Sequence, residues 1–407
     1  MRISRQLLLR FPCASSKRRG AVAGLRAIAP TAVACFLVIM ACAQSDLVDQ
    51  MTTQERIAKY AWWPTKGSVP SDKYVGNEAC VGCHAAIAKS QAKSEMGQTL
   101  LPAADSLSLT SNFGKPFKVD GFIYQVNHGP ESPIFSVSVS EHNISKPLVW
   151  AFGSGKISQV YFTPEKDTYN ESHFSYFDSI SGFDLTPAQP AVRVAAGKRQ
   201  SGDALQRAGG RTVEMNEARR CFACHTSNVP ANGPITNVAS GLTCEACHGP
   251  GGNHAAAEHA GLPQSAALIM NPAHLRPVDQ VDFCGACHAT SMDIQMGGGL
   301  GLPTVRFPAY RLLNSRCWMN DRRIQCTACH DPHEPLVHET SAYDEKCLAC
   351  HVVAGAAPSS EKPGKACSTA TKDCAGCHMP KYDFPDVHHK FTDHHIRVVR
   401  AGAPIPG

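Results

Sequence analysis

The chain has 407 residues, with 39 Lys and Arg against 34 Asp and Glu and a formal net charge of +5. Residues 1–41 hold seven of the basic residues and no acidic one, so the rest of the chain, with 32 basic and 34 acidic residues, has a net charge of −2. This balance excludes the strongly basic surface that proteins use to bind nucleic acid, and we expect no nucleic-acid partner.

The N-terminal segment predicts export. A basic stretch that ends at Arg26 is followed by "AIAPTAVACFLVIMAC", an apolar run that closes with small residues. This order is typical of a signal peptide, and the run is too short for a comfortable membrane span. We expect residues 1–41 to be removed and the mature chain to reach the periplasm or outer membrane. The "IMAC" sequence predicts a lipoprotein anchored only through Cys42, and ordinary cleavage after Ala41 or Ala43 is the alternative.

The pattern C-x-x-C-H occurs seven times, whereas random placement of 19 Cys and 19 His would give roughly 0.04 occurrences. In this pattern two thiols bond covalently to a haem and the histidine ligates its iron. Zinc ribbons and disulfides, the alternatives, do not require a histidine after every second cysteine. The sequence therefore predicts seven haem c groups. Their cysteines are Cys80, Cys83, Cys221, Cys224, Cys244, Cys247, Cys284, Cys287, Cys326, Cys329, Cys347, Cys350, Cys374 and Cys377, and their proximal histidines are His84, His225, His248, His288, His330, His351 and His378.

Between the first two motifs, "FIYQV" and "FSVSVS" alternate apolar with polar or small residues, which predicts short strands. The last six motifs leave about 26 residues for each haem, too few for an ordinary apolar core. We therefore expect a mainly α and irregular multihaem cytochrome c fold organised around stacked haems, with a small β-rich insert between motifs 1 and 2. The expected segments after the signal peptide are an N-terminal linker (42–73), a first haem-binding segment (74–107), the β-rich insert (108–182), a basic linker (183–220), a six-haem domain (221–397) and a C-terminal tail (398–407).

Several phrases of the sequence resemble, in order, a family of bacterial multihaem c-type cytochromes. They are "YVGNEACVGCH", "SEMGQTL", "GLTCEACHGPGGNH", "DFCGACH", "RLLNSRCW" running into "CTACHDPH", and "CAGCHMPKYDFPDVHHKFTDHHI". This family is similar to the superfamily that contains the tetrahaem carrier of ammonia oxidisers, hydroxylamine oxidoreductase and pentahaem nitrite reductase. The resemblance covers about residues 74–397. It implies exported electron transfer through closely spaced haems, in some members with an open haem where small nitrogen or sulfur compounds react.

The resemblance also implies second axial ligands at His254, His333, His388 and His394. His389 and His395 are adjacent alternatives, since the register can differ by one residue. His274 in "NPAHL" is a further candidate. Met96 in "SEMGQTL" can either pack against the first haem or ligate it, and a thioether ligand would raise the reduction potential of that haem.

The ligand inventory favours an electron carrier. Twelve histidines outside the motifs serve seven open axial positions, and the C-x-x-C-K motif of a nitrite reductase is absent from the sequence. We therefore expect a respiratory or extracellular electron carrier with redox partner proteins and no catalytic residue. An oxidoreductase of small nitrogen or sulfur compounds at one five-coordinate haem is the alternative, and a subunit of an extracellular haem filament is the third. The two remaining cysteines of the mature chain, Cys317 and Cys367, can form a disulfide or stay as thiols.

Overall fold

The computed structural model describes residues 74–406, apart from 193–201, 228, 230–232, 236–237, 322–323, 354, 363 and 401. The expected signal peptide, the lipid site at Cys42 and the N-terminal linker lie outside the described residues. No described helix is both long and apolar enough to cross a membrane.

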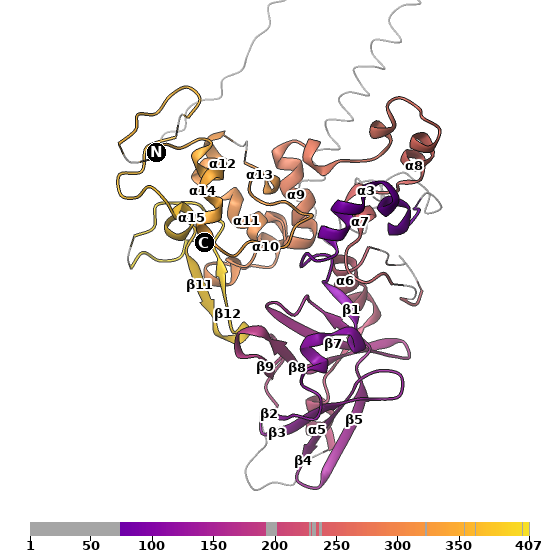
Figure 1. Cartoon of the computed structure of the whole chain (residues 1–407). Coiled ribbons are helices and arrows are strands. Elements are labelled where there is room, and N and C mark those ends of the chain that lie inside the picture. The colour runs from indigo at the N-terminus through magenta and orange to yellow at the C-terminus, as the bar shows by residue number, and fades with distance from the viewer. Residues whose placement is uncertain are drawn as a thin grey trace, which may run out of the picture. The chain divides into compact units, whose positions relative to one another are not determined.

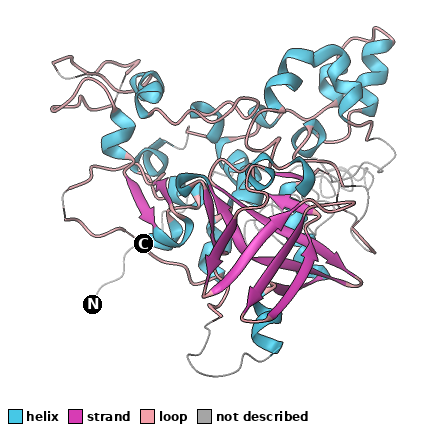
Figure 2. Ribbon diagram, turned by 60° about the horizontal axis from the view of Figure 1, so that its bottom comes forward, coloured by secondary structure: helices cyan, strands magenta, loops and turns pink. Residues whose placement is uncertain are grey.

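Two antiparallel sheets dominate the first half of the described chain (Figures 1 and 2). One sheet has the order β1-β6-β7-β8-β10, with β9 also paired to β8, and the other has the order β2-β3-β4-β5. The strands are β1 (Leu100–Pro102), β2 (Pro116–Val119), β3 (Phe122–Asn127), β4 (Ile134–Val139), β5 (His142–Pro147), β6 (Trp150–Phe152), β7 (Ser158–Glu165), β8 (Thr168–Phe177), β9 (Gly182–Leu185) and β10 (Arg211–Glu214). The strands expected around "FIYQV" and "FSVSVS" are thus confirmed as β3 and β4.

The expected fold class, mainly α and irregular around stacked haems, is wrong. The β-rich region is large and spans residues 100–185. Strand β8 lies within the expected insert, 108–182, and it buries polar residues on both faces. The Ser175 and Thr186 hydroxyls are 2.9 Å apart, and the Ser172 hydroxyl donates to the Phe174 carbonyl at 2.7 Å. The expected insert included β8, whereas β1 and β10, which join the same sheet, lie outside it.

The two larger sheets share one apolar core. Phe122, Tyr124 and Phe135 of the four-stranded sheet pack with Tyr161 and Phe174 of the other sheet, and all five side chains are fully buried. Alternate residues of β3 are buried, as the period of two requires for a strand with one face on the core. Helix α5 (Gly202–Ala208) packs its Leu205 side chain into this core.

The six-stranded sheet also packs against the helix that carries the second haem motif. Helix α6 (Met215–His225) places Phe222 against Phe152 at 4.8 Å and against Tyr169 at 5.5 Å between ring centroids. Phe222 is the residue after the first motif cysteine, and it is fully buried. The sheet thereby fixes the position of this motif.

The rest of the described chain consists of short helices, loops and one hairpin, formed by β11 (Lys381–Phe384) and β12 (His389–Thr392). The helices, besides α5 and α6, are α3 (Asn77–Gln91), α4 (Leu107–Thr110), α7 (Cys244–His248), α8 (Gly252–His259), α9 (Pro277–His288), α10 (Ser291–Met296), α11 (Pro308–Leu313), α12 (Arg316–Asp321), α13 (Cys326–Cys329), α14 (Asp344–Leu348) and α15 (Cys374–His378). A small apolar cluster of Val281, Ala309, Leu312 and Trp318 joins α9, α11 and α12.

Candidate haem-binding sites

Each of the seven motifs lies in or at the end of a helix. The first motif lies inside α3, the second and fourth end α6 and α9, and the third, fifth and seventh form α7, α13 and α15. The sixth begins in the last turn of α14. Residues three apart on a helical turn lie on one face, so this geometry directs both cysteines of a motif to the same side. It suits the attachment of two sulfurs to one edge of a porphyrin.

The described cysteines form no disulfides, Cys317 and Cys367 included. The described part of the chain also contains no group of three or more His, Cys, Asp or Glu side chains arranged to hold a metal ion. A haem iron instead takes two axial ligands from the protein, one on each side of the ring. Two facing histidines are therefore the arrangement that could hold a haem iron.

Three such pairs are present. The ring centroids of His84 and His254 are 6.4 Å apart with 22° between the ring planes, those of His248 and His333 are 6.0 Å and 10°, and those of His330 and His394 are 6.2 Å and 43°. With a metal-to-nitrogen bond of ~2 Å and a ring centre about 1 Å further out, two imidazoles on one iron have centroids about 6 Å apart. The side chains thus fit a bis-histidine haem at motifs 1, 3 and 5.

The hydrogen bonds of these histidines support the same assignment. The Nδ1 atom of His248 lies 2.8 Å from the Met270 carbonyl, and that of His254 lies 3.0 Å from the Ser265 carbonyl. An Nδ1–H group that donates to a carbonyl leaves Nε2 as the unprotonated nitrogen, which is the one that can ligate. The same Nδ1-to-carbonyl contact is made by His225, His351, His378 and His394.

Burial keeps several of these histidines in the neutral form that binds metals. It lowers the pKa of His225, His248, His288 and His330 below the ordinary value. Burial, with the neighbouring His330, lowers the pKa of His394 to about 4.

The other predicted second ligands have different surroundings. The His388 Nε2 atom is 2.8 Å from the Asp184 Oδ2 atom, so the nitrogen that would ligate contacts a carboxylate. His274 is exposed at the end of a short 3-10 helix. Met96 is partly buried after α3, and the structure places His254, rather than a thioether, opposite His84.

The two alternatives at adjacent positions have other neighbours. The His389 ring packs against Phe391 with 4.8 Å between ring centroids, and the His395 backbone N–H donates to Asp393 at 3.0 Å. Burial and the nearby His338 lower the pKa of His389. Burial and the charges of Arg311 and Arg397 lower the pKa of His395.

Cysteines of different motifs contact one another. The first cysteines of motifs 1 and 3, Cys80 and Cys244, lie close together, and burial and the Cys244 thiol raise the pKa of Cys80. The same holds for the first cysteines of motifs 4 and 5 and of motifs 6 and 7, which are the pairs Cys284 with Cys326 and Cys347 with Cys374. Because a motif cysteine is the attachment point of a haem, these contacts bring the edges of successive haem sites together.

Further contacts connect these pairs of motifs. Cys247 of motif 3 packs in one apolar cluster with Cys284 of motif 4. The Cys224 sulfur of motif 2 lies 4.0 Å from the Ala286 carbonyl, which is inside motif 4. The haem-binding segments are therefore contiguous from motif 1 through motifs 3 and 4 to motif 5, with motif 2 beside motif 4.

Three buried charged residues that the sequence prediction did not single out support this region. Arg311 and Asp393 form a fully buried ion pair of 2.7 Å next to His394. Glu245, between the cysteines of motif 3, is also buried. Glu245 had a signal in the sequence, because it is the only acidic residue inside any of the seven motifs.

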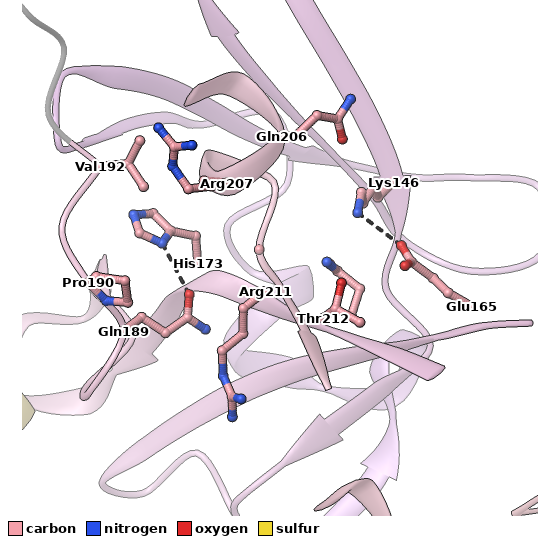
Figure 3. A pocket seen from close by; sticks show the side chains of 12 residues that line it. Lys146, Glu165, His173, Gln189, Pro190, Val192, Gln206, Arg207, Arg211 and Thr212 are labelled. Atoms are coloured by element: carbon pink, nitrogen blue, oxygen red, sulfur yellow. Dashed lines mark hydrogen bonds and ion pairs between the residues drawn. The ribbon is translucent and has the colours of Figure 1, made fainter. Parts of the chain in front are cut away.

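A pocket of about 450 Å³ lies apart from the motifs, in the β-rich region (Figure 3). Lys146 and Glu165 form an ion pair of 2.9 Å at one side of this pocket. On the other side, the His173 Nδ1 atom lies 3.1 Å from the Gln189 side-chain oxygen. No motif cysteine or motif histidine lines the pocket.

A family model described as cytochrome c554 and c-prime matches residues 182–249, which include motifs 2 and 3. This match supports a multihaem c-type cytochrome that binds haem covalently and transfers electrons. The solved structure titled "Crystal Structure of Outer Cell Wall Cytochrome OcwA" is similar to this chain, with a TM-score of 0.48 and 14% identity over 80% of each chain. No curated protein sequence matches the chain.

Proposed function

We propose that the protein is an exported heptahaem c-type cytochrome that carries electrons through a chain of covalently bound haems in respiratory or extracellular electron transfer. The observation that carries the proposal is the set of three facing histidine pairs. Two imidazole ligands close both axial positions of an iron, which suits electron transfer rather than substrate binding. When bound, each haem supplies one reversible one-electron redox step.

The side chains supply the other requirements of a carrier. The Nδ1 hydrogen bonds orient the ligand rings and select the tautomer, and burial raises the cost of a charged imidazole. The contacts between cysteines of different motifs hold the haem sites close together, and a short distance between redox centres is what electron transfer needs. No acid, base or nucleophile has to be placed.

The proposal is tested on the mature protein by haem analysis and by low-temperature EPR of the oxidised form, with and without nitrite or hydroxylamine. We expect seven haems per chain and low-spin signals that do not respond to either compound. A high-spin signal that shifts on addition of either compound would instead support the oxidoreductase alternative.

Export and lipid attachment at Cys42 are part of the same proposal. Fractionation of cells and labelling with a radioactive fatty acid test them on the full chain. We expect the protein in the envelope fraction with bound label, and Cys42→Ser without label. Label on the Cys42→Ser variant, or wild-type protein in the cytoplasm, would contradict this part of the proposal.

A further inference from the structure

Glu245 lies between the two cysteines of motif 3, but its carboxylate contacts two other parts of the chain. It accepts hydrogen bonds from the backbone N–H groups of Val75 at 3.0 Å, Gly76 at 2.9 Å and Gly251 at 2.9 Å. The residue is only 6% exposed. Charge-assisted hydrogen bonds of this kind are about twice as strong as those between neutral groups.

The three amides stand at the starts of two helices. Gly76 is the N-cap of α3 and Gly251 is the N-cap of α8, and a glycine has no side chain with which to cap a helix. The first amides of a helix have no partner within it, and the helix dipole favours a negative charge there. The Glu245 carboxylate supplies that partner and that charge to both helices at once.

These two helices carry the two halves of one haem site. Helix α3 bears Cys80, Cys83 and His84 of motif 1, and α8 bears His254, whose ring faces His84. The separation of the two rings therefore depends on how the starts of α3 and α8 are held relative to each other. Glu245 is the side chain that bonds to both starts.

We propose that Glu245 is a positioning residue for the haem of motif 1, although it belongs to the motif of another haem. It sets the spacing between His84 and His254 by capping α3 and α8 together. The inference rests on the proposed attachment of haem at the motifs. It predicts an effect at a different haem from the one whose cysteines flank Glu245.

The test compares full-length Glu245→Ala and Glu245→Gln with two reference variants, His254→Ala and His333→Ala. The first reference removes the second ligand of motif 1, and the second reference removes that of motif 3. Haem content, low-temperature EPR and a redox titration are recorded for each. Glu78→Ala is the matched control, because Glu78 is an exposed carboxylate in the first turn of α3.

We expect Glu245→Ala to keep its full haem content and to lose the same low-spin signal that His254→Ala loses. Glu245→Gln should keep part of that signal, because its amide oxygen still accepts hydrogen bonds but carries no charge. Glu78→Ala should match the wild type. A full set of low-spin signals in Glu245→Ala, or loss of the signal that His333→Ala loses, would overturn the inference. Absence of haem from the wild type would instead refute the proposed function.

Discussion

At the scale of single residues, the adjacent histidines 394 and 395 have different surroundings. The His394 ring faces His330, whereas His395 lies near the positive charges of Arg311 and Arg397. We predict that His394→Ala converts one low-spin haem to high spin and that His395→Ala leaves all low-spin signals in place. Low-temperature EPR of the oxidised variants measures this. Loss of a low-spin signal in His395→Ala, with all signals kept in His394→Ala, would show that His395 is the ligand.

Arg311 holds the segment that carries His394. Its Nε and Nη2 atoms donate to the two Asp393 carboxylate oxygens at 2.7 and 2.8 Å, and both side chains are fully buried. Without Arg311 the buried Asp393 carboxylate keeps one cation, Arg397, whose Nη1 atom donates to it at 2.6 Å. We therefore predict that Arg311→Met lowers the free energy of unfolding by about 2–3 kcal/mol, less than a fully unpaired buried charge would cost. Denaturant titration followed by circular dichroism measures the loss.

The chain contains a matched control for this prediction. Arg276 also donates two hydrogen bonds to one carboxylate, that of Asp279, but the arginine side chain is 76% exposed. Water already solvates both groups, so Arg276→Met should cost less than about 1 kcal/mol. Equal losses in the two variants would contradict a special role for the buried pair.

Residues with a local signature were predictable, and residues that act across the chain were not. His254, His333 and His394 follow recognisable phrases close to motifs, and the structure places each opposite a motif histidine. Glu245 contacts an amide 169 residues away, and Arg311 pairs with a carboxylate 82 residues away. Contacts over such distances depend on the folded chain: the sequence marks Glu245 as the only acidic residue inside a motif, but it does not show which amides its carboxylate binds.

At the scale of elements, two loops approach each other closely beside the first and third motifs. Gly241 has a φ of +64°, and a Cβ atom placed there would lie 2.0 Å from the Gly97 carbonyl oxygen. The Leu242 amide donates to the Met96 carbonyl at 3.0 Å in the same contact. A side chain at Gly241 would therefore force the loops apart and strain the backbone.

We predict that Gly241→Ala lowers the free energy of unfolding by about 2–3 kcal/mol more than Gly233→Ala does. Gly233 is the matched control, since its φ is +77° but a Cβ atom there would have no neighbour within 4 Å. The difference between the two variants thus isolates the close approach from the cost of the backbone conformation. Denaturation midpoints measure it, and equal midpoints would show that the loops separate freely.

The strands were only partly predictable. Strand β3 alternates apolar and polar residues and was recognised, whereas β8 buries Asn170, Ser172, His173 and Ser175 among neighbouring strands. These side chains meet their hydrogen-bonding needs inside the fold, which the sequence does not reveal. The expected insert, 108–182, covered β8 but not β1 and β10, whose pairing with β6 and β8 connects segments that are distant in the sequence.

At the scale of the whole described chain, His388 joins the C-terminal hairpin to the β-rich region. Its Nε2 atom is 2.8 Å from the Asp184 carboxylate, and its ring is 4.9 Å from the Phe177 ring. Its carbonyl also accepts a hydrogen bond from the Ser179 hydroxyl. These partners lie about 200 residues earlier in the chain, so the contact closes a long loop between distant segments.

This contact predicts a structural role for His388 rather than the ligand role that the sequence resemblance implies. Nε2 cannot bond to an iron while it contacts a carboxylate, so His388→Ala should retain every low-spin haem signal. Loss of the exposed ion pair and of the ring contact together should lower the free energy of unfolding by only about 1 kcal/mol. EPR and denaturant titration of the same sample measure both effects, with His394→Ala as the variant that must lose a signal. Conversion of one haem to high spin in His388→Ala would show that His388 leaves Asp184 and binds iron when the haems are in place.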